Sequence, residues 1–157
     1  MAEAERLLRR RKPRGLSRRD RLRWIGWLDR RLPVSLPWCG LFVAHCLEAA
    51  LPGIPIPHPR FRARPWETWG DPCAPQLGAV MVFWRYHPRA PFGHVGFYWA
   101  EDATSFHIIG GNQRDRVTIR PYPKDRLTAC RWPAGRAQPR LGRYLAHGRS
   151  APAQDQP

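Results

Sequence analysis

One segment constrains the fold more than any other, because residues 38–51 (WCGLFVAHCLEAAL) are apolar on nearly every side of a helix. Pro37 precedes this segment at the first helical position, where a missing N–H costs nothing, and Pro52 with Gly53 ends it. A helix that is apolar all round has to be buried on all sides. We therefore expect the chain to fold around it.

Strand patterns follow the helix, beginning near Gly78. Five β-favouring runs are separated by turn-rich segments, at residues 79–84, 94–99, 105–109, 116–120 and 129–132. This pattern predicts an antiparallel meander, and a buried helix followed by such a sheet is an α+β fold. The proline-rich stretch 52–77 between helix and strands is expected to be an ordered loop on the surface.

The length of 157 residues, with 43% hydrophobic residues, fits one compact domain with tails. We expect a basic helical N-terminal extension over 1–32, a main domain over 33–133 and a C-terminal tail over 134–157. Within the extension, helix-forming patterns cover 2–12 and 17–32.

The charge is strongly positive, with 27 Lys and Arg against 12 Asp and Glu, a net +15. Residues 1–32 alone hold twelve basic and four acidic side chains. Such a chain binds anions, and nucleic acid, an anionic membrane surface and an acidic cell wall all remain open. A merely solvated helix face is the alternative for the N-terminal charge.

The N-terminus lacks the apolar stretch of a secretory signal, and no apolar run is long enough to span a bilayer. We expect synthesis in the cytoplasm, with delivery by another route if the protein works outside. The four cysteines, Cys39, Cys46, Cys73 and Cys130, are irregularly spaced. This spacing suggests neither a zinc site nor a disulfide framework, and we expect no metal and no cofactor.

Cys39 is the candidate nucleophile, because it falls in the first turn of the predicted helix. Unpaired N–H groups and the positive end of the helix dipole stabilise a thiolate there, so we expect a lowered pKa. Cys46 falls in mid-helix and is expected to be a buried hydrophobe.

His94 is the candidate base, because an imidazole from another element has to approach the sulfur from the side. It opens an apolar strand, and Gly93 and Gly96 are expected to leave room around its ring. His45 points away from Cys39, since it follows six residues later on the same helix.

Asn112 is the candidate third group, since a neutral amide can orient an imidazole. It ends the next predicted strand in the run IIGGNQ. Gln113 and a backbone carbonyl are alternatives, and Gly-Gly-Asn is also a common turn sequence.

The strings PWCGLFVAHCL, GAVMVFWR, GHVGFY and GGNQRDRV, in this order, resemble the CHAP branch of the NlpC-type cysteine peptidases over roughly residues 35–133. The resemblance implies a papain-like catalytic domain that cleaves amide bonds of bacterial peptidoglycan without a metal. It places the nucleophile at Cys39, the base at His94 and a polar third member near Asn112. Family members often carry an acidic residue just before that asparagine, where this chain has Gly110 and Gly111.

Trp38, Trp84 and Tyr86 lie near these motifs and are candidates for binding a sugar-peptide substrate, with core packing as the alternative. Small size, the missing signal peptide and the basic charge suit a phage or prophage lysis enzyme, or a tail-borne wall peptidase, acting in the periplasm or cell wall. Two rival interpretations are a basic nucleic-acid-binding module and a non-catalytic structural component of a phage-like particle.

Overall fold

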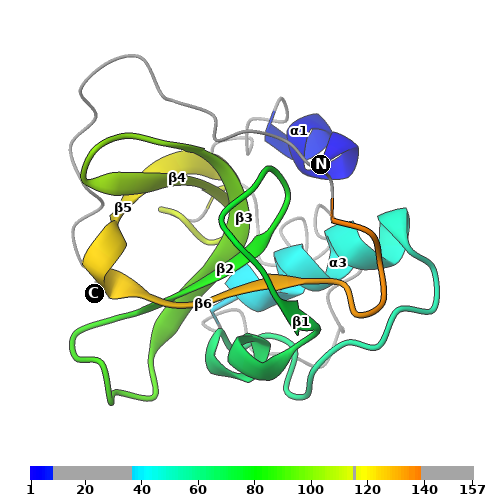
Figure 1. The fold of residues 1–157 in the computed structure, drawn as a ribbon, viewed down its shortest axis with the longest axis horizontal. Helices are drawn as coiled ribbons and strands as arrows, with labels where there is room; N and C mark the ends of the chain where they lie inside the picture. The colour runs from blue at the N-terminus through cyan, green and yellow to red at the C-terminus, as the bar shows by residue number, and fades with distance from the viewer. Residues whose placement is uncertain (9–36, 115, 139–157) are drawn as a thin grey trace, which may run out of the picture.

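The computed structural model of the chain describes residues 1–8, 37–114 and 116–138. These residues form two α-helices, two short 3-10 helices and one six-stranded antiparallel sheet (Figure 1). The helices are α1 (Ala2–Leu8), α3 (Cys39–Ala50), η1 (Arg64–Thr68) and η2 (Lys124–Arg126). The strands are β1 (Asp71–Pro72), β2 (Val80–Trp84), β3 (Gly93–Glu101), β4 (Ser105–Gly110), β5 (Thr118–Pro123) and β6 (Leu127–Trp132). The α+β class is confirmed, while the helix predicted over 17–32 lies outside the described residues.

Helix α3 is the buried helix that its composition predicts, and it is buried along most of its length. Its N-cap is Trp38, so Pro37 lies one residue before the cap and not at the first helical position, as we expected. The helix ends at Ala50 with Leu51 as its C-cap, and Gly53 has a positive φ of 81°. This conformation favours glycine, so the chain turns at Gly53 after the helix has ended.

The sheet has the strand order β1-β6-β2-β3-β4-β5. Strands β2 to β5 form the predicted antiparallel meander, and β6 then returns to pair with the other edge of β2. Each of the five predicted runs overlaps one of these strands. Strand β1 was not predicted, because two residues that include a proline carry no periodic signal.

The sheet is strongly curved. The ring of Tyr122 on β5 stacks at 5.0 Å on Phe83 of β2, although β3 and β4 lie between these strands in the sheet order. Neighbouring strands lie about 4.8 Å apart, so a flat sheet would separate the two rings by roughly 14 Å. The concave face encloses its own apolar cluster, whose buried members are Ala79, Met81, Phe83, Tyr98, Phe106 and Ile108. The other face packs on α3 through Val82, Val95 and Phe97.

The proline-rich stretch 52–77 is not only a surface loop, which corrects the sequence prediction. It contains η1 and contributes Trp66, which is 0% exposed, and Trp69 to the core around α3. Each indole N–H donates to a carbonyl of the same stretch, Trp66 to Arg60 at 3.2 Å and Trp69 to Pro55 at 2.7 Å. The loop is ordered because two tryptophans anchor it with satisfied polar groups.

Helix α1 joins the same core, although its residues belong to the segment expected to form an extension. Ala4 and Leu7 are buried in the core cluster that contains α3. Glu3 also faces His45, whose Nε2 lies 2.9 Å from the carboxylate. The rest of the proposed extension, residues 9–32, lies outside the described part of the chain.

Candidate active site

Cys39 is the first residue of α3 and its sulfur lies against strand β3. The backbone N–H of Val95 donates toward the sulfur, as do the N–H groups of Cys39 and Gly40 at the start of the helix. The ladder between β3 and β4 begins only at Phe97. The Cys39 sulfur therefore contacts β3 at Val95, before the pairing of β3 with β4 begins, and Val95 directly follows His94 in the chain.

Gly40 is required for this placement. A Cβ at this position would lie 2.1 Å from the carbonyl oxygen of Arg60. The same carbonyl accepts the Trp66 indole N–H, so the backbone that crosses the helix start cannot easily retreat. The Cys-Gly pair thus lets the stretch 52–77 cover the first turn of α3, and it leaves Cys39 only 3% exposed.

Burial raises the pKa of the Cys39 thiol, and the three backbone N–H groups offset this only in part. The expected lowering of the Cys39 pKa is therefore wrong. Desolvation disfavours the thiolate more than the helix start favours it. The resting sulfur is a neutral thiol.

His94 lies on the concave side of the sheet, opposite to its neighbour Val95. Its ring stacks on Tyr122 with a centroid separation of 4.7 Å and an interplanar angle of 5°. Burial lowers the pKa of His94 to about 3, assisted by the positive charges of Arg85 and Arg120. The imidazole is neutral at neutral pH, and the burial that keeps it neutral also opposes its protonation in the closed site.

Tyr122 was not among the predicted site residues. Its ring fills the space between His94 and Phe83, and burial raises its pKa, as would a thiolate at the nearby Cys39. Tyr122 therefore fixes the plane of the imidazole and lies close to both members of the pair. Its sequence context, RPYP, carried no signal beyond an aromatic residue in a strand.

The far nitrogen of His94 faces a glycine. A Cβ at Gly110 would lie 2.7 Å from His94 Nε2 and 2.6 Å from the side-chain nitrogen of Gln113. The imidazole and the Gln113 amide nitrogen thus both lie next to the Gly110 backbone. Gly93 and Gly96, which were expected to make room for the ring, are instead close to Phe83 and Ile108.

Gln113 brings an amide to this point that is almost fully buried. Its side-chain nitrogen donates to the carbonyls of Ile108 and Thr118, which fixes the orientation of the amide. Among the described residues, neither Gln113 Oε1 nor His94 Nε2 has a hydrogen-bond partner. An acceptor and a potential donor of two neighbouring side chains are therefore buried without partners, which is costly unless they pair.

Asn112 is half-buried, and its φ of 57° is left-handed, as in the turn that Gly-Gly-Asn also suggested. The structure brings Gln113, the alternative to Asn112, to the imidazole.

The three aromatic side chains considered for substrate binding have different surroundings. Trp38 is buried, and a Cβ at Gly111 would lie 2.5 Å from its ring, so it packs the helix start. Trp84 donates to the Asp125 carbonyl at 3.2 Å and lies under Arg126. Tyr86 is 54% exposed and packs edge-on against Phe92, which is also exposed. Of these three side chains Tyr86 is the exposed one, and the Arg85 guanidinium lies 5.3 Å from its ring centroid.

The loop 85–92 that carries Tyr86 is anchored. The Arg64 guanidinium donates to the carbonyls of Pro88 and Ala90 at 2.7 Å and pairs with Glu67. This network positions Arg85, whose charge lowers the pKa of both Cys39 and His94.

Two residues that the sequence analysis set aside lie away from this site. Cys46 is buried in mid-helix near Glu3, and burial raises the pKa of its thiol to about 12. His45 is held by Glu3 of α1. Both belong to the contact between the two helices.

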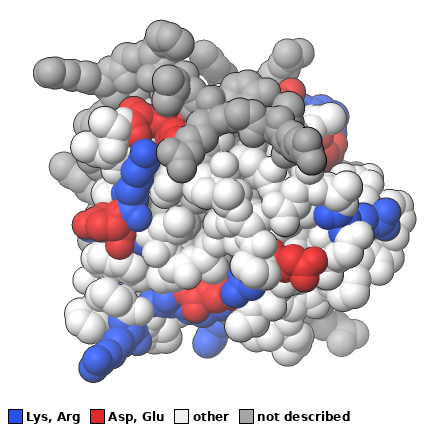
Figure 2. All heavy atoms as spheres, viewed as in Figure 1, with Lys and Arg blue, Asp and Glu red and all other residues white. Residues whose placement is uncertain are grey.

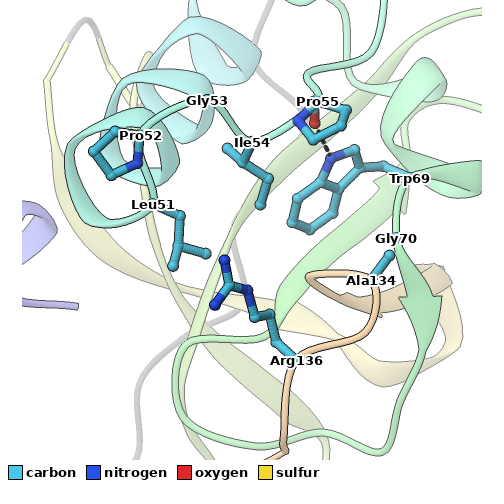
Figure 3. Close-up of a pocket in the computed structure, with 9 residues that line it drawn as sticks. All are labelled: Leu51, Pro52, Gly53, Ile54, Pro55, Trp69, Gly70, Ala134 and Arg136. Atoms are coloured by element: carbon cyan, nitrogen blue, oxygen red, sulfur yellow. Dashed lines mark hydrogen bonds between the residues drawn. The ribbon is translucent and has the colours of Figure 1, made fainter.

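A cavity of about 240 Å³ opens at the other end of α3 (Figure 3). Its walls are Leu51, Pro52, Gly53, Ile54, Pro55, Trp69, Gly70, Ala134 and Arg136. Because α3 has 12 residues, this cavity lies roughly 18 Å from Cys39. It is not part of the thiol site.

Figure 2 shows Lys and Arg beside Asp and Glu around a broad uncharged area on one face of the molecule. Ten of the fifteen excess positive charges fall outside the described residues. Within the described ranges, no group of three or more His, Cys, Asp or Glu could hold a metal ion. No helix in those ranges has the length and apolarity to cross a bilayer.

Comparison with known proteins gave no match among protein-family models, curated proteins or solved structures. The interpretation of the site therefore depends on its own residues.

Proposed function

We propose that the chain is a cysteine hydrolase with a papain-like arrangement, in which Cys39 is the nucleophile and His94 the base. One observation carries the proposal: the N–H of Val95, next to His94, is directed at the sulfur of a cysteine at a helix start. This contact supports the pairing, because it holds the Cys39 sulfur of α3 at the strand residue that directly follows His94.

The reaction begins from a neutral pair. His94 removes the thiol proton as the Cys39 sulfur attacks a carbonyl carbon, and the protonated imidazole then gives this proton to the leaving amine. Water, deprotonated by His94, attacks the thioester and releases the acid and the free thiol. The N–H groups at the start of α3 are available to the developing oxyanion. Because Cys39 is buried, the substrate has to open the site when it binds.

Gln113 orients the base in this proposal. We propose that its Oε1 accepts a hydrogen bond from His94 Nε2 when the substrate opens the site, which leaves Nδ1 for the thiol proton. Tyr122 holds the ring plane from the side. Asn112, which the sequence resemblance favoured, then supports the turn.

We propose bacterial peptidoglycan as the substrate and an amide bond of the wall as the bond that is cut. Support comes from the strings around Cys39, His94 and Gly110, which resemble peptidoglycan hydrolases, and from the net charge of +15. A basic chain is attracted to anionic walls and membranes. A phage-type enzyme, delivered to the wall by a lysis system or a particle, fits these properties.

Digestion of purified peptidoglycan tests this function. The wild-type chain is expected to release fragments with new amine and carboxylate termini, identified by mass spectrometry. Cys39→Ala should release none, and Cys46→Ala should match the wild type, since Cys46 only packs the helix contact. Equal digestion by the Cys39→Ala and wild-type chains would refute the proposal.

A further inference from the structure

Cys73 and Cys130 lie opposite one another at the edge of the sheet, away from the proposed active site. The register of β1 and β6 pairs Asp71 with Trp132 and Pro72 with Arg131, and its continuation pairs Cys73 with Cys130. The Cys73 N–H donates to the Cys130 carbonyl at 3.1 Å, and the two sulfurs are 3.5 Å apart. Residues that face each other across paired strands have the Cα spacing that a disulfide needs.

The two thiols have unequal acidity. Hydrogen bonding from Cys130 lowers the pKa of Cys73, with further contributions from Gln76 and Arg131. The same contact raises the pKa of Cys130, which keeps its proton. Both side chains are half-buried, whereas Cys39 and Cys46 are buried. A thiol with a lowered pKa and a resolving thiol are thus placed together, 3.5 Å apart and within reach of small reagents.

We propose that Cys73 and Cys130 form a redox-sensitive dithiol that is oxidised to an intramolecular disulfide by exchange with small disulfides such as oxidised glutathione. Irregular spacing along the chain gave no indication of this pair. The return of β6 to the β1 edge brings together two residues that are 57 positions apart.

The exchange balances in two steps. The Cys73 thiolate attacks one sulfur of oxidised glutathione, forms a mixed disulfide and releases one glutathione thiolate. Cys130 then loses its proton to solvent, attacks the Cys73 sulfur and releases the second glutathione. Two protein thiols are oxidised and one external disulfide is reduced.

The resulting bond joins the short strand β1 to β6. It closes a loop that contains β2 to β5 and with them His94, Gln113 and Tyr122. Strand β1 pairs only with β6, through two residues, so the bond would secure the weakest edge of the sheet.

Thiol mapping of the full, folded chain tests the inference. The reduced chain is treated with oxidised glutathione, quenched with N-ethylmaleimide and analysed by intact mass and peptide mapping. The expected result is loss of two alkylatable thiols and a peptide pair joined through Cys73 and Cys130. A lasting glutathione adduct on Cys73 with Cys130 still alkylatable would overturn the proposal, as would four thiols that remain reduced.

Single serine variants separate the two roles. Cys130→Ser should stop at the mixed disulfide on Cys73, and Cys73→Ser should leave Cys130 reduced. Cys46→Ser is the matched control and should form the disulfide as the wild type does. Formation of the disulfide at an equal rate in denaturant would show that the folded placement has no part in it. None of these measurements depends on hydrolysis, so they can succeed or fail independently of the proposed function.

Discussion

The start of α3 and the edge formed by β1 and β6 each place a cysteine sulfur beside hydrogen-bond donors, with opposite results. At the helix start, Cys39 receives three backbone N–H groups, yet burial raises the pKa of its thiol. At the sheet edge, Cys73 has a thiol donor and a nearby Arg131, and its pKa is lowered. The difference is exposure, since Cys39 is buried and Cys73 is half-buried.

This comparison separates chemical reactivity from proposed catalysis. A surface reagent meets Cys73 as a half-buried thiol with a lowered pKa, whereas Cys39 is a buried neutral thiol that, in the proposed mechanism, needs His94 to take its proton. The residue that reacts fastest with a probe is therefore not the proposed nucleophile. The following predictions test the buried site of Cys39 and His94.

Gly110→Ala is expected to have the largest effect on activity. The added methyl would lie 2.7 Å from His94 Nε2, so the imidazole or the Gln113 amide has to move. Displacing a general base costs about 10²- to 10⁴-fold in rate, and we expect a loss of about 10³-fold in kcat/KM. Gly53→Ala is the control for loss of stability without a clash, because Gly53 has a φ of 81°, has no neighbour within 4 Å and lies at the far end of α3. This control should lower stability and leave the activity of the folded protein unchanged. Full activity of Gly110→Ala would contradict the position of the His94 imidazole beside Gly110.

Gln113→Ala is expected to lower kcat by about 10- to 100-fold, because a loosely held imidazole spends less time in the reactive geometry. Asn112→Ala should change kcat by less than about threefold, since Asn112 lies in the turn. Steady-state rates on a soluble muropeptide measure both. A larger loss of kcat in Asn112→Ala than in Gln113→Ala would assign the orienting role to Asn112.

The stability of the protein should fall as the pH falls from 6.5 to 4.5. The pKa of His94 is about 3 in the folded chain against 6.5 in the unfolded chain, so the unfolded chain binds an additional proton in this window. Stability is therefore highest above pH 6.5, and the loss from this one group is about 2 to 3 kcal/mol by pH 4.5. Urea unfolding at several pH values measures it, and His94→Gln should flatten the slope. An unchanged slope in that variant would mean that the imidazole is not buried as a neutral group.

Much of this structure could be predicted from the sequence. The apolar helix, the five main strands and the α+β class follow from periodicity. Apolar residues recur about every 2 residues in a half-buried strand and about every 3.6 residues in a helix. Cys39 and His94 could be selected because each falls at the start of a predicted element. These are local properties of the chain.

The remaining features depend on contacts between distant segments. Tyr122 reaches His94 only because the sheet curves, and Gln113 reaches it only because the turn at Gly110 and Gly111 directs the amide inward. The direction of the Cys39 pKa shift depends on the backbone at Arg60, which covers the helix start. No periodicity or spacing in the sequence reports such coverage.

The most direct test of the central claim is an alkylation time course with iodoacetamide in which modified sites and wall-digesting activity are measured in the same samples. We expect Cys73 to react first with no loss of activity, because its pKa is lowered and its side chain is half-buried. Activity should then fall in step with slow modification of Cys39 and reach zero when Cys39 is fully modified. Loss of activity that follows Cys73, or full activity with Cys39 alkylated, would contradict the assignment of Cys39 as the nucleophile.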